Sequence, residues 1–229
     1  RKNELLEFFN FEKLDIEIIF KKSYLVKFRI PKVLPLKLIF WPFISDSNFQ
    51  FTLKNQRKQF LLLDGYFQWI LLQKDFNEIV NILKTIFIKN DTSIINSNYC
   101  VVHIRGGDFV KLGWNVLTPE SYYIESINFM KEKHDINNFV IVTDDEVYAK
   151  SVLCNLKFNF DFISSDIKTD FYTISNYSNR ILSASTFALW ASSLGKNEEG
   201  IVIAPAYWFP NKKREINLPN EIKIKGVSI

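Results

Sequence analysis

The residues best suited to chemistry follow a short apolar run, where positions 103–108 read HIRGGD. His103 and Arg105 are two residues apart, so on an extended segment their side chains point to the same side. A guanidinium can hold phosphate oxygens through paired hydrogen bonds, and adjacent glycines let the backbone approach a ligand closely. The loop therefore fits an anion site, although a surface arginine in a turn, paired with Asp108, would give the same pattern.

Two later loops carry polar side chains at the start of an expected helix. Asp144 and Asp145 could accept hydrogen bonds from the N–H edge of guanine or from ribose hydroxyls, but capping of the helix explains them as well. Positions 183–187 read SASTF. Small hydroxyl residues that open a helix leave N–H groups available to an anionic phosphate, and capping is again the alternative.

These loops belong to a regular alternation of strands and helices that begins at Tyr99. The expected strands are 99–105, 139–143, 160–164, 180–183 and 201–204, and the expected helices are 119–134, 144–153, 170–178 and 185–194. Thr118 is expected to cap the first of these helices. The alternation predicts an α/β fold with a doubly wound parallel sheet, in which ligands bind at the carboxyl ends of the strands.

The segments on either side of this alternation are less regular. In the first part of the chain, 14–20 and 24–30 resemble strands, 66–88 has helical spacing, and 90–98 is polar enough to be a linker. After the last expected strand, the aromatic segment 204–209 is expected to close the sheet and to lie in the core.

Composition excludes several classes of protein. The 229 residues are 47% hydrophobic and 24% charged, which excludes a disordered or low-complexity chain. No apolar run reaches the roughly 20 residues of a membrane span, and we recognise no signal peptide. The net charge is only +4, and the basic residues are not interleaved with aromatics, so no nucleic-acid partner is expected. Cys100 and Cys154 are expected to be reduced thiols in the core of a cytosolic protein.

Absent motifs narrow the classes of enzyme. Neither GxGxxG nor GxxxxGK[ST] is present to support a dinucleotide-binding or P-loop enzyme. Neither HExxH nor a Cys/His cluster is present, so no metal site is expected. Only six of the 29 basic residues are arginine, which makes Arg105 a noteworthy member of its loop.

Six segments, in order over roughly residues 61–210, resemble the elements of one enzyme family. LLLDGYFQ is similar to DGYWQS, VVHIRGGDFV to HxRRGDY, and TPESYYIESINFM to a tyrosine-bearing helix. FVIVTDDEVYAKSVL is similar to an FSDD segment, ILSASTFALWASSL to NSSFSWWAAYL, and GIVIAPAYWF to KIVAPKKWF. The family that these segments resemble is the α-1,2-fucosyltransferases of glycosyltransferase family 11, common in bacterial surface-polysaccharide loci such as those for O-antigen.

This resemblance implies a fold and an activity. The fold would be a GT-B-like arrangement, with an acceptor-side N-terminal region (1–97) and a C-terminal Rossmann-like domain (98–229) that binds a GDP sugar. The reaction would be an inverting, metal-independent transfer of fucose from GDP-fucose to O-2 of a terminal galactoside of a glycan or lipid-linked oligosaccharide. No cofactor is expected beyond this donor substrate.

The resemblance also implies roles at the three loops. Arg105 would neutralise the β-phosphate of the donor, and Asp108 is our candidate for the carboxylate that receives or orients the acceptor proton. The other expected donor-binding residues are His103 and one of Asp144 and Asp145 at the guanine or ribose end, and Ser185, Thr186 and Phe187 along the phosphate and base pocket.

Two departures from the family pattern leave alternatives open. Gly106 stands where the second arginine of HxRR is expected, and a GGLGNQ segment expected near the start is not among the 229 residues, so we expect 1–97 to be incomplete. One alternative is a catalytically degenerate relative that binds a GDP sugar or a glycan, and another is a superfamily fucosyltransferase with a different acceptor. We expect a cytoplasmic protein whose excess of lysine allows peripheral contact with the inner membrane.

Overall fold

The structure is a computed structural model that describes residues 8, 43–45, 62–64, 73–88, 95–111, 117–163, 166–195, 199–209 and 212–225. The chain divides into two compact units, one made of Arg1–Asn10 with Gln73–Ile229 and the other of Phe11–Leu72. The functional division expected at residue 97 stays a prediction, and so does the GT-B-like arrangement.

In the smaller unit, β1 (Phe43–Ser45) and β2 (Leu62–Asp64) pair in parallel. The strands expected at 14–20 and 24–30 lie outside the described residues. All other described elements belong to the larger unit.

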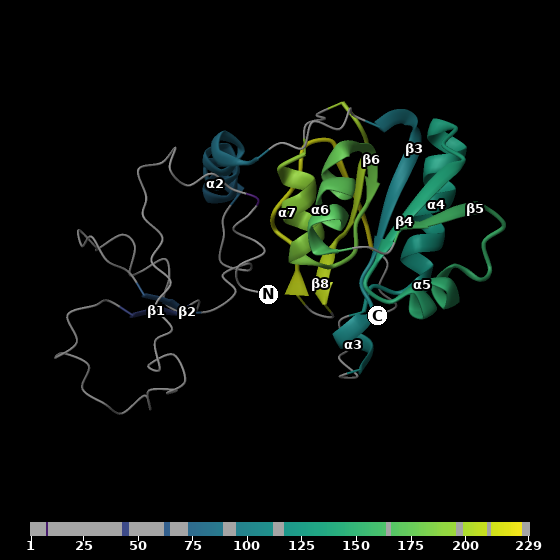
Figure 1. The fold of residues 1–229 in the computed structure, drawn as a ribbon, viewed down its shortest axis with the longest axis horizontal. Helices are drawn as coiled ribbons and strands as arrows, with labels where there is room; N and C mark the ends of the chain where they lie inside the picture. The colour runs from purple at the N-terminus through teal and green to yellow at the C-terminus, as the bar shows by residue number, and fades with distance from the viewer. Residues whose placement is uncertain are drawn as a thin grey trace. The chain divides into compact units, whose positions relative to one another are not determined.

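A six-stranded parallel sheet forms the centre of the larger unit (Figure 1). Its strands, in spatial order, are β10 (Glu221–Ile224), β7 (Val202–Pro205), β6 (Tyr177–Ile181), β3 (Ile95–Ile104), β4 (Asn138–Thr143) and β5 (Asn159–Ile163). Within the sheet, β3 is the first strand along the chain, and β4 and β5 follow it on one side. The chain then crosses to the other side of β3, where it forms β6, β7 and β10 in turn. Every neighbouring pair is parallel, so the α/β parallel sheet is confirmed.

Helices cover both faces of this sheet (Figure 1). α4 (Glu120–His134) and α5 (Glu146–Leu153) pack on one face, and α6 (Ile167–Asn176) and α7 (Thr186–Ser193) pack on the other. A sheet covered on both faces favours strands that are apolar on both sides, as in the Val- and Ile-rich runs of β3, β4 and β7. β6 departs from this pattern, because it contains the buried Arg180.

The core on the α4–α5 face contains alternate residues of the strands. Val102 and Ile104 of β3 lie in it, together with Tyr122 and Ile127 of α4. Because successive side chains of a strand point to opposite faces, His103 projects to the α6–α7 face. The alternation along β3 therefore places apolar side chains on the α4–α5 face and the polar ring of His103 on the other.

α2 (Gln73–Ile86) precedes the sheet and packs through one side of the helix. Its Phe76 ring lies 5.3 Å from the ring of Trp190 in α7. The Gln73 amide donates to the backbone carbonyl of Asn217 at 3.0 Å, and its oxygen accepts from the Asn217 backbone N–H at 2.6 Å. These contacts attach α2 to the sheet unit.

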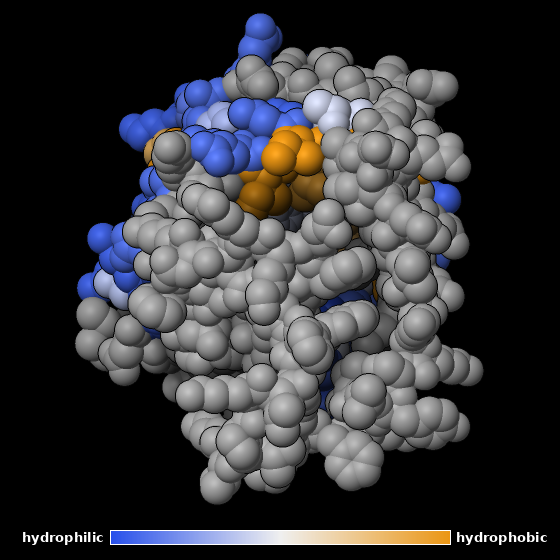
Figure 2. All heavy atoms as spheres, turned by 90° about the vertical axis from the view of Figure 1, so that its left-hand side faces the viewer, coloured by the Kyte–Doolittle hydropathy of each residue, from blue (hydrophilic) through white to orange (hydrophobic). Residues whose placement is uncertain are grey.

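The side of the unit on which α2 lies is mostly hydrophilic where the residues are described, with a small hydrophobic group among them (Figure 2). Ile82 and Ile88 are among the exposed large hydrophobic side chains. Single exposed hydrophobic residues such as these are normal on a protein surface. No described helix is long and apolar enough to cross a membrane.

The sequence led us to expect that the sheet closes at 204–209, but it does not. β10 adds a further strand outside β7, and a buried ion pair between Arg214 and Glu221 holds it there. Trp208 is buried, in agreement with the expected core position. The remaining short elements are α3 (Gly107–Lys111), β8 (Tyr207–Phe209) and β9 (Lys212–Lys213), the last two antiparallel to each other.

The two cysteines are free but differ in burial. Cys100 is fully buried in β3, as expected. Cys154 is exposed, so its expected place in the core was wrong. It follows the last residue of α5 and forms the carboxyl cap of that helix, beyond the side that packs on the sheet.

Candidate functional site

The winding of the sheet changes direction between β3 and β6. From β3 the chain continues to α4 on one face, and from β6 it continues to α7 on the other. Ligands of doubly wound sheets bind at the carboxyl ends of the two strands that flank such a point. At this position lie residues 105–108 after β3, which run into the start of α3, and the loop 182–185 after β6.

His103 connects the two strands at this point. Its Nδ1 lies 2.7 Å from the Ser183 hydroxyl oxygen, and its ring centroid lies 5.9 Å from that of Phe187. The Tyr123 hydroxyl donates to the His103 carbonyl at 3.5 Å. The structure thus brings together the first and third loops selected from the sequence.

The imidazole of His103 is neutral at ordinary pH. Only 4% of the residue is exposed. Burial lowers its pKa to about 3, and the nearby positive charge of Arg105 acts in the same direction. A neutral ring can position groups by hydrogen bonds but cannot supply positive charge to an anion.

Arg105 lies between two carboxylates. Its Nη1 is 2.5 Å from Asp144 Oδ2, and its Nη2 is 2.6 Å from Asp108 Oδ1. The guanidinium also lies over the Phe109 ring, 5.2 Å from the centroid. With 28% of its side chain exposed, it remains accessible from solvent. The ion pair with Asp108 that the sequence offered as an alternative is therefore present, and phosphate binding by Arg105 stays a prediction.

The two aspartates after β4 have different contacts. Asp144 accepts from the backbone N–H of Gly106 through Oδ1 at 2.9 Å, while its Oδ2 contacts Arg105. Asp145 accepts from the backbone N–H of Tyr148 at 3.0 Å and is the amino cap of α5. α5 therefore begins at Glu146 rather than at Asp144, because Asp145 is extended and uses its side chain as the cap. Contact of either carboxylate with guanine or ribose stays a prediction.

The glycines of the first loop allow this close packing. A Cβ on Gly106 would lie 2.7 Å from Tyr148 Cδ1 and 2.9 Å from Asp145 Cβ. Gly107 has a φ of +36°, and a Cβ there would overlap Asp144. The position at which the family pattern has a second arginine is thus packed directly against the first turn of α5.

The start of α7 lies on the β6 side of the site. Its amino cap, Ser185, makes no side-chain capping hydrogen bond, and the first turn contains no acidic residue. Helix N-terminal N–H groups and the helix dipole favour anions at such a position. Thr186 and Phe187 occupy this first turn, where the sequence placed them, and their contact with a phosphate or base stays a prediction.

Thr118 does not cap α4. The amino cap is Pro119, which has no side-chain hydrogen bond of this kind. The Thr118 hydroxyl instead accepts from the backbone N–H of Ala184 at 2.9 Å. Thr118 thus connects the segment before α4 to the loop after β6.

Tyr122 is a buried residue of this region that was not singled out individually in the sequence. Its hydroxyl donates to the Leu182 carbonyl at 2.6 Å, just before the loop at the start of α7. Burial raises the pKa of its phenol well above the ordinary value, so it remains a donor. A pair of tyrosines in the first turn of the helix was the available signal, but it does not reveal which carbonyl is bound.

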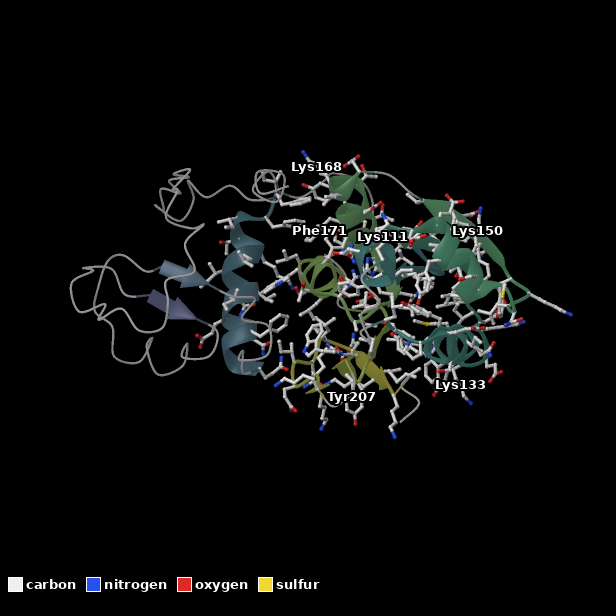
Figure 3. All side chains as sticks on the ribbon, turned by 90° about the horizontal axis from the view of Figure 1, so that it is seen from below. Lys111, Lys133, Lys150, Lys168, Phe171 and Tyr207 are labelled. Carbon is white, nitrogen blue, oxygen red and sulfur yellow. The ribbon has the colours of Figure 1, made fainter. Side chains whose placement is uncertain are left out.

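Figure 3 views the sheet unit from below, and Lys111 of α3 lies between Phe171 of α6 and Lys150 of α5 in this view. Among the described residues, no group of three His, Cys, Asp or Glu side chains could hold a metal ion. This edge presents one guanidinium, one helix N-terminus and the acidic side chains beside them.

Three relatives of known name are similar to this chain. The O-antigen biosynthesis glycosyltransferase WbnK of Escherichia coli is 22% identical over 220 residues, which cover 90% of this chain and 70% of that protein. An alpha-1,2-colitosyltransferase of Escherichia coli is 33% identical over 129 residues, which cover 53% and 44%. The galactoside 2-alpha-L-fucosyltransferase SEC1 of Bos taurus is 26% identical over 106 residues, which cover 43% and 29%. The last two alignments span less than half of those proteins.

A family model agrees with these similarities. The model described as glycosyl transferase family 11 matches residues 41–225, which contain the whole sheet and its carboxyl-end loops. The resemblance recognised from six short segments thus extends over most of the sequence. The chain belongs to glycosyl transferase family 11.

Proposed function

We propose that this protein transfers fucose from GDP-fucose to O-2 of a terminal galactoside, with inversion at the anomeric carbon and without a metal ion. The observation that carries the proposal is the position of Arg105 and the start of α7 on the two sides of the β3–β6 switch point, joined by His103. Two named relatives, an alpha-1,2-colitosyltransferase and a galactoside 2-alpha-L-fucosyltransferase, act at the same kind of linkage.

The chemistry requires stabilisation of a leaving nucleoside diphosphate. As the bond between fucose C1 and the β-phosphate breaks, negative charge grows on the phosphate oxygens. A preorganised guanidinium stabilises that charge more in the transition state than in the ground state. Arg105 supplies this cation, and the N–H groups of α7 near Thr186 supply further donors for the phosphates.

The acceptor hydroxyl must lose a proton as it attacks from the opposite face of the sugar. Asp108 is the carboxylate that we propose for this proton, because it lies beside Arg105 and half of its side chain (49%) is exposed. His103 and one of the aspartates after β4 would hold the guanine or ribose. In this arrangement the neutral His103 acts through hydrogen bonds and not through charge.

A second candidate donor is favoured by a specific observation. Among the three named relatives, the highest identity, 33%, is to an alpha-1,2-colitosyltransferase. Colitose lacks the 3-hydroxyl of fucose, so a GDP-colitose enzyme and a GDP-fucose enzyme differ at one polar contact. A site that hydrogen-bonds a substrate hydroxyl rejects the analogue without it by large factors. The ratio of the two turnover rates therefore distinguishes the two donors.

The test is nucleotide binding followed by product analysis. We expect GDP to raise the melting temperature of the protein by mass action, and UDP, ADP and CMP to have smaller effects. GDP-fucose and GDP-colitose are then supplied with a β-galactoside acceptor, and the linkage of the product is determined by NMR. Stabilisation by UDP or CMP without stabilisation by GDP would exclude this donor class, and a product linked elsewhere than at O-2 would exclude the regiochemistry.

The wider setting of the reaction is also a proposal. The acceptor would be a galactose-terminated glycan or lipid-linked oligosaccharide, and the acceptor side would be built by the N-terminal region of a GT-B-like enzyme. We place the protein in the cytoplasm, where lysine-rich surfaces could contact the inner membrane. Release of the protein from anionic vesicles by salt would support that contact, and equal binding to neutral vesicles would contradict it.

A further inference from the structure

Two carboxylates contact the Arg105 guanidinium, and they differ in what else holds them. Asp144 is bound through both oxygens, because Oδ1 accepts from the Gly106 backbone N–H while Oδ2 contacts Nη1. Asp108 contacts Nη2 through a single oxygen, and its side chain is 49% exposed, against 31% for Asp144. Asp144, in the loop after β4, is thus held by two contacts, whereas Asp108, in α3, is held by one and is more exposed.

We propose, on the basis of the proposed function, that these two carboxylates have opposite effects on the binding of the donor diphosphate. Asp144 is a positioning residue that fixes the guanidinium and the Gly106 backbone together. Asp108 occupies the place on Nη2 that a phosphate oxygen of the donor takes. Binding of the diphosphate exchanges one anionic partner of Arg105 for another.

The strengths of the contacts permit this exchange. An ion pair between exposed side chains contributes little, because solvent screens it and two flexible side chains must be ordered. A diphosphate carries more charge than a carboxylate and forms charge-assisted hydrogen bonds with a guanidinium fork. Asp144 is harder to replace, because it holds the guanidinium and the Gly106 N–H at once. A neutral amide at this position can still accept from that N–H, but it loses the charged contact that fixes Nη1.

The exchange also gives Asp108 a role after the donor has bound. While it is paired with Arg105, one of its oxygens is engaged by the guanidinium. Once the phosphate takes that position, the carboxylate is available beside the reacting carbon to receive the acceptor proton. The donor therefore binds before the acceptor in a productive order.

Isothermal titration calorimetry of the whole chain with GDP and with GMP tests the proposal, because GMP lacks the β-phosphate. The variants are Asp108→Asn and Asp144→Asn. The control is Glu146→Gln, which removes one negative charge from the first turn of α5, where Glu146 contacts Lys150 at 2.6 Å and not Arg105. This control measures the effect of charge alone on anion binding.

We expect Asp108→Asn to bind GDP about threefold more tightly than Glu146→Gln does, the size of one exposed ion pair, and to bind GMP no more tightly. Asp144→Asn should bind GDP about tenfold more weakly than wild type, with GMP affected much less. Asp108→Asn no tighter than the control would overturn the proposal. So would an equal loss of GDP and GMP affinity in Asp144→Asn, which would place Asp144 on the nucleoside instead.

Failure of the proposed function gives a different result. If wild type binds UDP and not GDP, the donor assignment is wrong, and the comparison is repeated with UDP and UMP. If wild type binds no nucleoside diphosphate, both proposals fall. Should Asp144→Asn not fold, the exposed Asp108→Asn decides the matter, since its loss leaves the Asp144 contacts in place.

Discussion

Two arginines of the sheet unit, Arg105 and Arg180, lie in opposite surroundings. Arg105 is at the carboxyl ends of the strands, partly exposed, between two carboxylates. Arg180 lies within β6 and is only 2% exposed. It donates to the carbonyls of Ile174 at 2.9 Å and Ser175 at 3.1 Å, in the last turn of α6, and to the Ser192 carbonyl of α7 at 3.3 Å.

The difference separates a cation that holds the fold from one that can exchange partners. Backbone carbonyls at helix C-termini are fixed in place and carry the negative end of the helix dipole, so a buried guanidinium there has permanent acceptors. Burial lowers the pKa of Arg180 to about 10, which still leaves it charged at neutral pH. Carboxylates on a surface loop are acceptors that another anion can replace, which is the property that a phosphate-binding arginine needs.

Arg180→Met should have the largest effect on stability. The substitution removes the donors for three buried carbonyls in a space closed by neighbouring backbone, because even a Cβ on Gly195 would clash with the guanidinium. We expect the free energy of unfolding to fall by about 4 kcal/mol, the sum of several unsatisfied buried groups. Urea denaturation followed by tryptophan fluorescence measures the change.

Arg105→Met is the matched control for this prediction. It removes the same group from an exposed pair, and we expect it to cost less than about 1 kcal/mol of stability. An Arg180→Met protein as stable as wild type would show that the carbonyls find other donors and would end the distinction between the two arginines.

Arg105→Ala should have the opposite profile, a large loss of activity with little change in stability. Gly106 leaves Arg105 as the only arginine of its loop. We expect kcat/KM to fall by the equivalent of about 3 kcal/mol, typical of removing one preorganised charge-stabilising donor. Arg105→Lys should recover little, since an ammonium cannot reproduce the fork of a guanidinium. Near wild-type turnover of Arg105→Ala would make this arginine a structural turn residue.

The comparison also shows what the sequence could and could not reveal. The Val- and Ile-rich runs revealed the strands, and the rule for parallel sheets revealed which loops meet. Rarity of arginine, however, did not separate function from structure. Arg180 and Arg214 are also among the six arginines of the chain, yet both are buried and bind groups that hold the fold together. Burial depends on contacts between α6, α7 and β6 that no local pattern records.

Local caps and the last strand were harder to predict for related reasons. Thr118 precedes a helix and has the side chain of a cap, but a backbone N–H of a distant loop takes its hydroxyl. β10 reads EIKI, and its charged residues obscure a strand that one buried ion pair holds to the sheet. In each case a long-range contact outweighs the local preference.

Gly106→Ala tests how tightly the Arg105 loop is held against α5. The added Cβ would lie 2.7 Å from Tyr148 Cδ1, so either the loop or the ring must shift. We expect a loss of about 2 kcal/mol of stability, in the usual range for overpacking, together with reduced activity as Arg105 moves. In a Tyr148→Ala background the same substitution should cost less, although the contact with Asp145 Cβ at 2.9 Å remains. Equal costs in the two backgrounds, measured as a double-mutant cycle, would show that the ring does not limit this position.

The smallest expected effect concerns His103, which is buried and also lies at the candidate site. Its folded pKa of about 3 lies below the ordinary value of 6.5. Between these values the unfolded chain binds more protons than the folded one, so stability rises with pH in this window and is lost as the pH falls from 6.5 towards 3. From pH 6.5 to pH 5.5 the loss attributable to His103 should be about 1 kcal/mol.

His103→Gln keeps a group that can bond Ser183 but does not titrate, so its unfolding free energy should fall less over that interval. Because burial is the larger cause of the shift and Arg105 the second, Arg105→Ala should change this slope less than His103→Gln does. A His103→Gln protein with the wild-type slope would mean that the imidazole is already accessible to protons, and therefore to solvent and ligands, in the folded state.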